Sequence, residues 1–262
     1  MRRILLFGGN AAIAAYLDVL HCCCDVHGVR EDDGVAEVFF DGDLPPLGEH
    51  RVTAQDLPPE VAGDRRTGLE ADVAIRVSDR ILVRPPWVGT PAGFLGLEIV
   101  VPRGMAFGSG EHGSTQAALL ALDELWPSPP PARALDVGTG SGVLARFLQL
   151  RGAGSVSACD VEEPAVAAAR LLLGDSDVRL GGPDRFAPER FDLVVANLDA
   201  RQLATAWEEL LARVTPAGTL VVSGLRPAEQ RAFEGRMQSE PIVRRERLGY
   251  VALGWGLGGT GA

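Results

Sequence analysis

One short stretch, residues 134–148, constrains the fold of this chain more than any other. An apolar run ends in an acid, Asp136, and three glycines that alternate with small residues follow, beginning with Gly138 and Gly140. Residues 143–148 then have the pattern of an apolar helix. This order predicts a buried strand, a tight turn and the start of a helix. Glycine lets the backbone bend sharply and approach a ligand, and the free N–H groups of the helix start face that ligand.

Strands and helices are predicted to alternate from this stretch onward. The strand-like runs 155–159 and 191–196, for example, are each followed by a helical pattern. Repeated βα units predict an α/β fold with a doubly wound, mostly parallel sheet. Ligands of such sheets bind at the carboxyl ends of the strands.

The N-terminal part of the chain has a different pattern. Residues 1–50 predict a strand, a helix and a hairpin, which together make a small α+β domain. Residues 51–70 are polar and interrupted by proline and glycine, so we expect a linker before a larger domain at 71–262. Residues 1–50 contain three arginines and nine acids. This charge is typical either of a solvated surface or of a docking platform for a basic partner.

Composition argues against several classes of protein. The net charge of −10 argues against a protein that grips nucleic-acid phosphates. No run is apolar for long enough to span a membrane. Three of the four cysteines are adjacent, at Cys22, Cys23 and Cys24, and this spacing suits neither a disulfide framework nor a metal site. We therefore expect a cytoplasmic protein without a metal. All 25 basic residues are arginine, which we attribute to coding bias.

Two kinds of nucleotide ligand fit the glycine turn. Gly140, Gly142 and Ala145 satisfy the looser dinucleotide pattern G-x-G-x-x-A, so a nicotinamide dinucleotide stays open. Asp136 favours a ligand with positive charge, such as the sulfonium and ammonium of S-adenosylmethionine. Asp160 ends the next strand, about 20 residues after the turn, and would bind ribose hydroxyls in either case. Its alternative role is to cap the helix that follows it.

A glycine-rich loop, residues 102–115, precedes the turn. Its composition predicts an irregular, bendable segment that could act as a lid. Ser114 or Thr115 could cap the helix that runs to about Leu125. His112 by itself does not indicate a metal ligand or a general base.

Four features stand in the same order and register as in a known family. They are the loop 105–115 (MAFGSGEHGST), the turn 136–142 (DVGTGSG), Asp160 and the strand 191–198 (FDLVVANL). The chain thereby resembles the PrmA family of methyltransferases, which modify a protein of the large ribosomal subunit. The resemblance is specific over residues 97–225. It implies a class I methyltransferase fold with a seven-stranded sheet, S-adenosyl-L-methionine as cofactor, and methylation of lysine side chains or the N-terminal amine of that basic protein.

The resemblance also implies roles for individual residues. Cofactor contacts would fall on four positions, Thr115, Gly138, Asp160 and Asn197; Asp136 and Gly140 are added on physical grounds. Asn197 would in addition position the acceptor amine, and its alternative role is to end a strand and cap the next helix. At Gly113 the family has proline, so we expect the glycine to loosen the loop. Glu162 stands where a shorter aspartate is usual.

Several alternatives stay open beside the family function. The acceptor could be another protein or a small molecule. Two alternatives belong to other functional classes: an NAD(P)-dependent oxidoreductase and a non-catalytic binding module. For the family function we expect a monomer that contacts the ribosomal protein, without direct contact to nucleic acid or a membrane.

Overall fold

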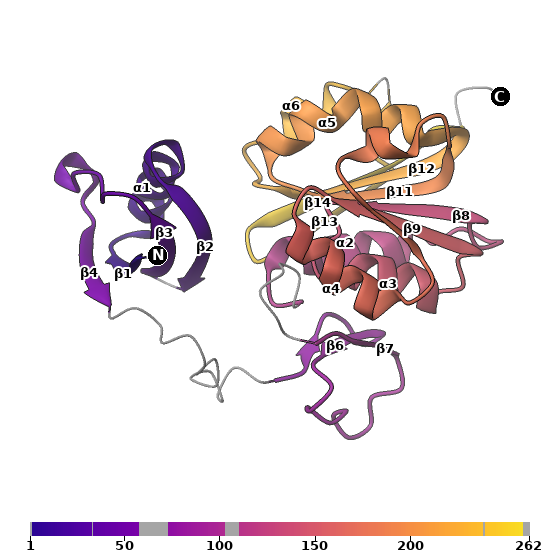
Figure 1. Cartoon of the computed structure of the whole chain (residues 1–262), viewed down its shortest axis with the longest axis horizontal. Helices are drawn as coiled ribbons and strands as arrows, with labels where there is room; N and C mark the ends of the chain where they lie inside the picture. The colour runs from indigo at the N-terminus through magenta and orange to yellow at the C-terminus, as the bar shows by residue number, and fades with distance from the viewer. Residues whose placement is uncertain (1, 33, 58–72, 103–109, 238, 259–262) are drawn as a thin grey trace. The chain divides into compact units, whose positions relative to one another are not determined.

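The computed structural model in Figure 1 describes residues 2–32, 34–57, 73–102, 110–237 and 239–258. The chain divides into two compact units, Met1–Leu69 and Glu70–Ala262. Among the helices described, none has the length and apolar character needed to cross a membrane.

The first unit is a four-stranded antiparallel sheet with a helix on one face (Figure 1). Its elements are β1 (Arg2–Phe7), α1 (Asn10–Cys23), β2 (Asp25–Asp32), β3 (Val35–Asp41), the 3-10 turn η1 (Gly48–His50) and β4 (Thr53–Leu57). The strand order is β2-β3-β1-β4. Apolar side chains of α1, such as Tyr16 and Leu20, pack with Ile4, Val38 and Phe40 of the sheet. The small α+β fold predicted for this region is present.

The predicted linker is wrong at its start. Thr53–Leu57 form β4, which pairs antiparallel with β1, with Leu6 opposite Ala54. Val52 is buried in the core of the unit, and Ala54 packs against that core. The strand is held chiefly by backbone hydrogen bonds to β1, so its polar sequence gives little periodic signal. Residues 58–72 lie outside the described part of the chain.

The second unit contains the predicted doubly wound sheet, with seven strands. They are β8 (Arg133–Val137), β9 (Ser155–Asp160), β10 (Asp177–Leu180), β11 (Phe191–Asn197), β12 (Val214–Leu225), β13 (Val243–Arg247) and β14 (Tyr250–Gly256). They lie in the order β10-β9-β8-β11-β12-β14-β13. β14 pairs antiparallel with both β12 and β13, whereas the other pairings are parallel, so the sheet is mostly parallel, as predicted.

Helices cover both faces of this sheet (Figure 1). They are α2 (Gly113–Glu124), α3 (Val143–Leu150) and α4 (Glu163–Leu173) on one face, and α5 (Ala200–Arg213) and α6 (Gln230–Glu234) on the other. A small sheet of β5 (Ile75–Arg76), β6 (Ile81–Arg84) and β7 (Leu97–Val100) adds side chains such as Val83 and Ile99 to the core under α2. The strand order reverses beside β8, where the chain turns to β9 on one side and β11 on the other. Ligands of doubly wound sheets bind at such a switch point.

The core under α5 depends on Trp207. This side chain is 1% exposed and packs edge-to-face on Trp255, with ring centroids 6.2 Å apart, and against Phe233. We expect Trp207→Ala to lower the free energy of unfolding by about 3–5 kcal/mol, because it leaves a large cavity. Leu171→Ala, at a side chain that is 88% exposed, is the control and should change stability by less than about 0.5 kcal/mol. Urea unfolding monitored by circular dichroism measures the stability of both variants. Equal losses in the two variants would show that the core does not depend on Trp207.

Candidate cofactor and acceptor site

The glycine turn after β8 is closely fitted to its surroundings. The N–H groups of Gly138 and Thr139 both donate to the carbonyl of Cys159, at 2.9 and 3.0 Å, and so fix the turn to the end of β9. Gly138 has a φ of 69°. A Cβ at this position would lie 2.3 Å from Cδ2 of Leu198, so only glycine fits. Gly140 also has a positive φ, of 54°. The turn therefore presents bare backbone at the switch point of the sheet.

Asp136 is a fully buried carboxyl at the end of β8. Its Oδ2 accepts hydrogen bonds from the Thr139 hydroxyl at 2.7 Å and from the Ala145 N–H at 3.0 Å. Its Oδ1 has no partner among the residues described. Burial raises the pKa of this carboxyl to about 7, against the two hydrogen bonds, and the nearby Asp160 adds to the rise. An orphaned carboxyl oxygen of this kind fits a ligand that carries positive charge near the turn.

Asp160 connects the turn to the next strand. Its Oδ2 accepts from the Gly140 N–H at 2.9 Å, and its Oδ1 accepts from the Glu162 N–H at 3.0 Å. Each carboxylate oxygen has a second lone pair, so the group can still bind two ribose hydroxyls. The alternative role as the N-cap of α4 is wrong, because Glu162 occupies that position.

Asn197 and Thr115 meet at the other side of the switch point. The Asn197 amide nitrogen lies 3.3 Å from Oγ1 of the buried Thr115, to which it donates. The Ser223 hydroxyl donates to the Ser114 carbonyl at 2.8 Å, so the start of α2 is attached to both β11 and β12. The Asn197 carbonyl oxygen is then directed away from Thr115. Asn197 does not cap α5, because Asp199 does so through a capping box.

His112, which the sequence did not single out, caps α2. Its side chain accepts a hydrogen bond from the Ser114 N–H, and the expected caps Ser114 and Thr115 lie inside the helix. Burial and the charge of Arg226 lower the pKa of His112 to about 4. The imidazole is therefore neutral near pH 7, and its Nδ1 can act as an acceptor. A neutral histidine at an N-cap position gives no recognisable sequence signal.

Gly113 does not loosen the loop as expected. It is the buried first residue of α2, and a Cβ there would lie 2.5 Å from the Arg247 carbonyl oxygen and 2.8 Å from Leu248 Cβ. The glycine lets the β13–β14 turn pack directly on the start of the helix. The rest of the predicted lid, residues 103–109, lies outside the described residues.

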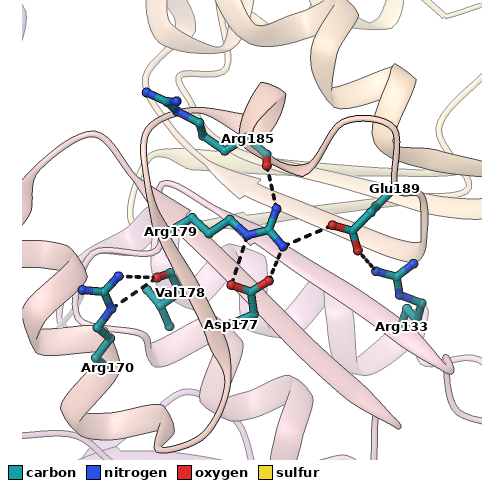
Figure 2. Close-up of polar contacts among 7 residues, drawn as sticks. All are labelled: Arg133, Arg170, Asp177, Val178, Arg179, Arg185 and Glu189. Carbon is teal, nitrogen blue, oxygen red and sulfur yellow. Dashed lines mark hydrogen bonds and ion pairs between the residues drawn. The ribbon is translucent and has the colours of Figure 1, made fainter.

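A charged network joins the amino ends of β8 and β10 and braces the segment that follows β10 (Figure 2). The Arg179 guanidinium contacts both carboxylate oxygens of Asp177, donates to the Arg185 carbonyl at 2.6 Å and pairs with Glu189, which also binds Arg133. These contacts hold the 3-10 turn η2 (Pro183–Phe186) against β10.

The six predicted site residues thus form two connected groups. One group contains the turn and its two acids, namely Asp136, Gly138, Gly140 and Asp160; the other is the Thr115–Asn197 pair. Leu198 connects them, because it follows Asn197 in the chain and its side chain covers Gly138. The arrangement can hold a nucleoside over β8 and β9 and present an amide carbonyl beside it.

The buried carboxyl makes stability depend on pH. Because the folded pKa of Asp136 exceeds its unfolded value of 3.8, the folded state favours the protonated form. Its contribution to stability is complete below about pH 4 and is lost as the pH rises towards about 7. We expect Asp136→Asn, without ligand, to remove this loss and to be more stable than the wild type above pH 7. Thermal unfolding from pH 4 to 8 tests this, with the exposed Asp79→Asn as control; parallel wild-type and Asp136→Asn curves would contradict it.

Comparisons with known proteins agree with this geometry. The family model described as ribosomal protein L11 methyltransferase (PrmA) matches residues 73–240. The ribosomal protein L11 methyltransferase of Geotalea uraniireducens is 34% identical, covering 96% of this chain and 81% of the relative. The enzyme of that name from Syntrophotalea carbinolica is 36% identical over 182 residues, covering 65% of this chain. The chain spans 59% of that relative and 60% of the one from Symbiobacterium thermophilum.

A solved structure shows the same likeness in three dimensions. The crystal structure of ribosomal protein L11 methylase from Lactobacillus delbrueckii subsp. bulgaricus matches this fold with a TM-score of 0.62 at 26% identity. The match covers 69% of this chain and 96% of that structure. The family model covers well over half of the chain, and the predicted motif residues converge at the switch point of the sheet. The chain therefore belongs to the ribosomal protein L11 methyltransferase (PrmA) family.

Proposed function

We propose that this protein transfers methyl groups from S-adenosyl-L-methionine to amino groups of ribosomal protein L11. The observation that carries the proposal is the pairing of two acids around a bare glycine turn with the Thr115–Asn197 contact beside it. The names of the relatives supply the acceptor. The proposed acceptor groups in that protein are lysine side chains, the N-terminal amine, or both.

The chain's own residues account for binding of the cofactor. When bound, S-adenosylmethionine supplies an activated methyl group on a sulfonium. Asp160 accepts hydrogen bonds from the ribose hydroxyls, and the turn at Gly138 and Gly140 leaves space for the nucleoside. Asp136 would place a negative charge beside the cationic amino-acid portion of the cofactor. That interaction would compensate the cost of burying the Asp136 carboxylate.

Asn197 orients the acceptor. The ammonium form of a lysine side chain has a pKa of about 10.4 and must release a proton to water before its nitrogen can attack. The Asn197 amide nitrogen donates to the Thr115 hydroxyl, so the amide oxygen is available and would accept a hydrogen bond from the acceptor amine, which would orient the lone pair of the amine nitrogen towards the methyl group. Alignment of this kind needs no protein nucleophile and no metal.

The buried carboxyl of Asp136 argues against the alternative of an NAD(P)-dependent oxidoreductase. A nicotinamide dinucleotide would place its pyrophosphate at the glycine turn, close to a buried acid with an orphaned oxygen. Two like charges there would repel each other.

The acidic first unit would dock the basic substrate. Its −6 charge would attract a ribosomal protein and hold it while different amines reach the site.

Ligand binding tests the core of the proposal. We expect S-adenosylhomocysteine to raise the melting temperature of the wild type, because it binds only the folded state, and NADPH to leave it unchanged. Asn197→Ala, assayed with saturating S-adenosylmethionine so that a lost cofactor contact does not limit the rate, should lower the rate of methyl transfer to L11 by about 100-fold, an effect of alignment. Near-normal turnover in Asn197→Ala would show that the amide does not position the acceptor.

Ionic strength tests the docking role. We expect kcat/KM for L11 to fall at least about tenfold between 50 mM and 500 mM salt, because screening weakens attraction to the acidic unit. Cofactor affinity, measured by calorimetry over the same range, should change much less. A kcat/KM that does not depend on salt would exclude electrostatic docking.

A further inference from the structure

A cluster of three side chains lies beside the site on the side away from the two acids. The Arg226 guanidinium carbon lies 4.0 Å from the centroid of the Tyr250 ring, and the His112 ring lies 4.2 Å from it. A Cβ on Gly113 would reach within 3.0 Å of the Tyr250 ring. The cluster thus joins the end of β12, the start of β14 and the N-terminus of α2.

The backbone brings this cluster close to Asn197. Asn197 is opposite Ser223 in the β11–β12 pairing, and the Leu198 N–H donates to the Ser223 carbonyl at 3.1 Å. The backbone of Gly224 packs even more closely against Leu198, since a Cβ on Gly224 would lie 2.0 Å from the Leu198 carbonyl oxygen. Arg226 follows two residues later. The acids are at the ends of β8 and β9, whereas the cluster is at the ends of β12 and β14, on the other side of β11.

We propose that Arg226 places a permanent positive charge on the acceptor side of the site, where it favours the neutral, reactive form of the incoming amine. The inference rests on the proposed function. Arg226 is a positioning residue in this scheme: it selects the protonation state of the amine that Asn197 orients.

The charge distribution around Arg226 supports this role. Five charged or titratable residues stand in the cluster or on the segments around it: Glu111 and His112 before α2, Glu229 before α6, Arg247 on β13, and Tyr250. Glu229 accepts a hydrogen bond from the Arg226 backbone N–H at 2.7 Å, and Arg247 binds Gln116. Burial chiefly lowers the pKa of His112 and the charge of Arg226 adds to this, so Arg226 disfavours a second positive charge in the cluster.

A positive charge helps here because the nitrogen changes charge during the reaction. A protonated lysine carries a full positive charge, whereas the attacking nitrogen carries only part of one in the transition state. The guanidinium therefore repels the inactive ammonium more strongly than the transition state. Arginine suits the role because its own charge does not change in the working pH range.

The pH dependence of single-turnover methylation of L11 tests the proposal. We expect Arg226→Gln to move the acidic limb of the rate profile about one unit higher. Because the transition state keeps part of the positive charge, the rate at pH 7 should fall by about threefold and recover near pH 10. Arg226→Lys keeps the charge and should keep the wild-type profile. Arg244→Gln, at an exposed β13 residue that pairs with Glu246, is the matched control and should also leave the profile unchanged.

A binding measurement gives a second readout that does not depend on turnover. L11 whose lysines carry ¹³C-methyl groups can be bound to the protein with S-adenosylhomocysteine, and the pKa of the engaged amine read by NMR. We expect a value at least about one unit below that of free L11 in the wild type, and a rise towards the free value in Arg226→Gln. The pKa of His112 should rise in the same variant.

Each outcome decides a separate question. An equal loss of rate at every pH, the same shift in Arg244→Gln, or an engaged amine with its free pKa in the wild type would overturn the role of Arg226. If Arg226→Gln does not fold, Arg226→Met and the wild-type NMR titration decide the matter. A wild-type protein that binds no S-adenosylhomocysteine, or methylates no L11, would instead refute the proposed function.

Discussion

The site depends on one buried carboxyl. Asp136 stands at the end of β8, where two donors, the Thr139 hydroxyl and the Ala145 N–H, share a single oxygen. These bonds tie the strand end to the turn and to the first turn of α3. Because the second oxygen has no partner among the described residues, the arrangement is costly without a ligand. Stability and ligand binding are therefore coupled at the same residue.

The parts of the fold that could be predicted from the sequence are those that short, local residue patterns determine. The strand–turn–helix at Asp136 and the buried run of β11 are such patterns, and both stand where expected. Asp160 and Asn197 were predictable because strand ends in a parallel sheet meet at one edge. Because each of these residues ends a predicted parallel strand, the order of strands and helices along the chain was enough to place Asp160 and Asn197 at that edge.

The features that escaped prediction all depend on contacts between distant segments. β4 is a strand because β1 offers a free edge, although its own sequence is polar. Gly113 is needed because the β13–β14 turn occupies the space of a side chain, more than 130 residues later in the chain. His112 caps a helix with a neutral ring only because it is buried beside Arg226. A single sequence does not show which distant residues will pack against a given position.

The exclusive use of arginine as the basic residue has a consequence for the proposed function. Arg179 bridges two carboxylates and a carbonyl with one planar group, which a lysine ammonium could not span in the same way. With all 25 basic residues arginine, no side chain of the chain bears a primary amine. Under the proposed function, a catalyst of lysine methylation with this sequence has no lysine side chain that could compete with its substrate, however concentrated it becomes.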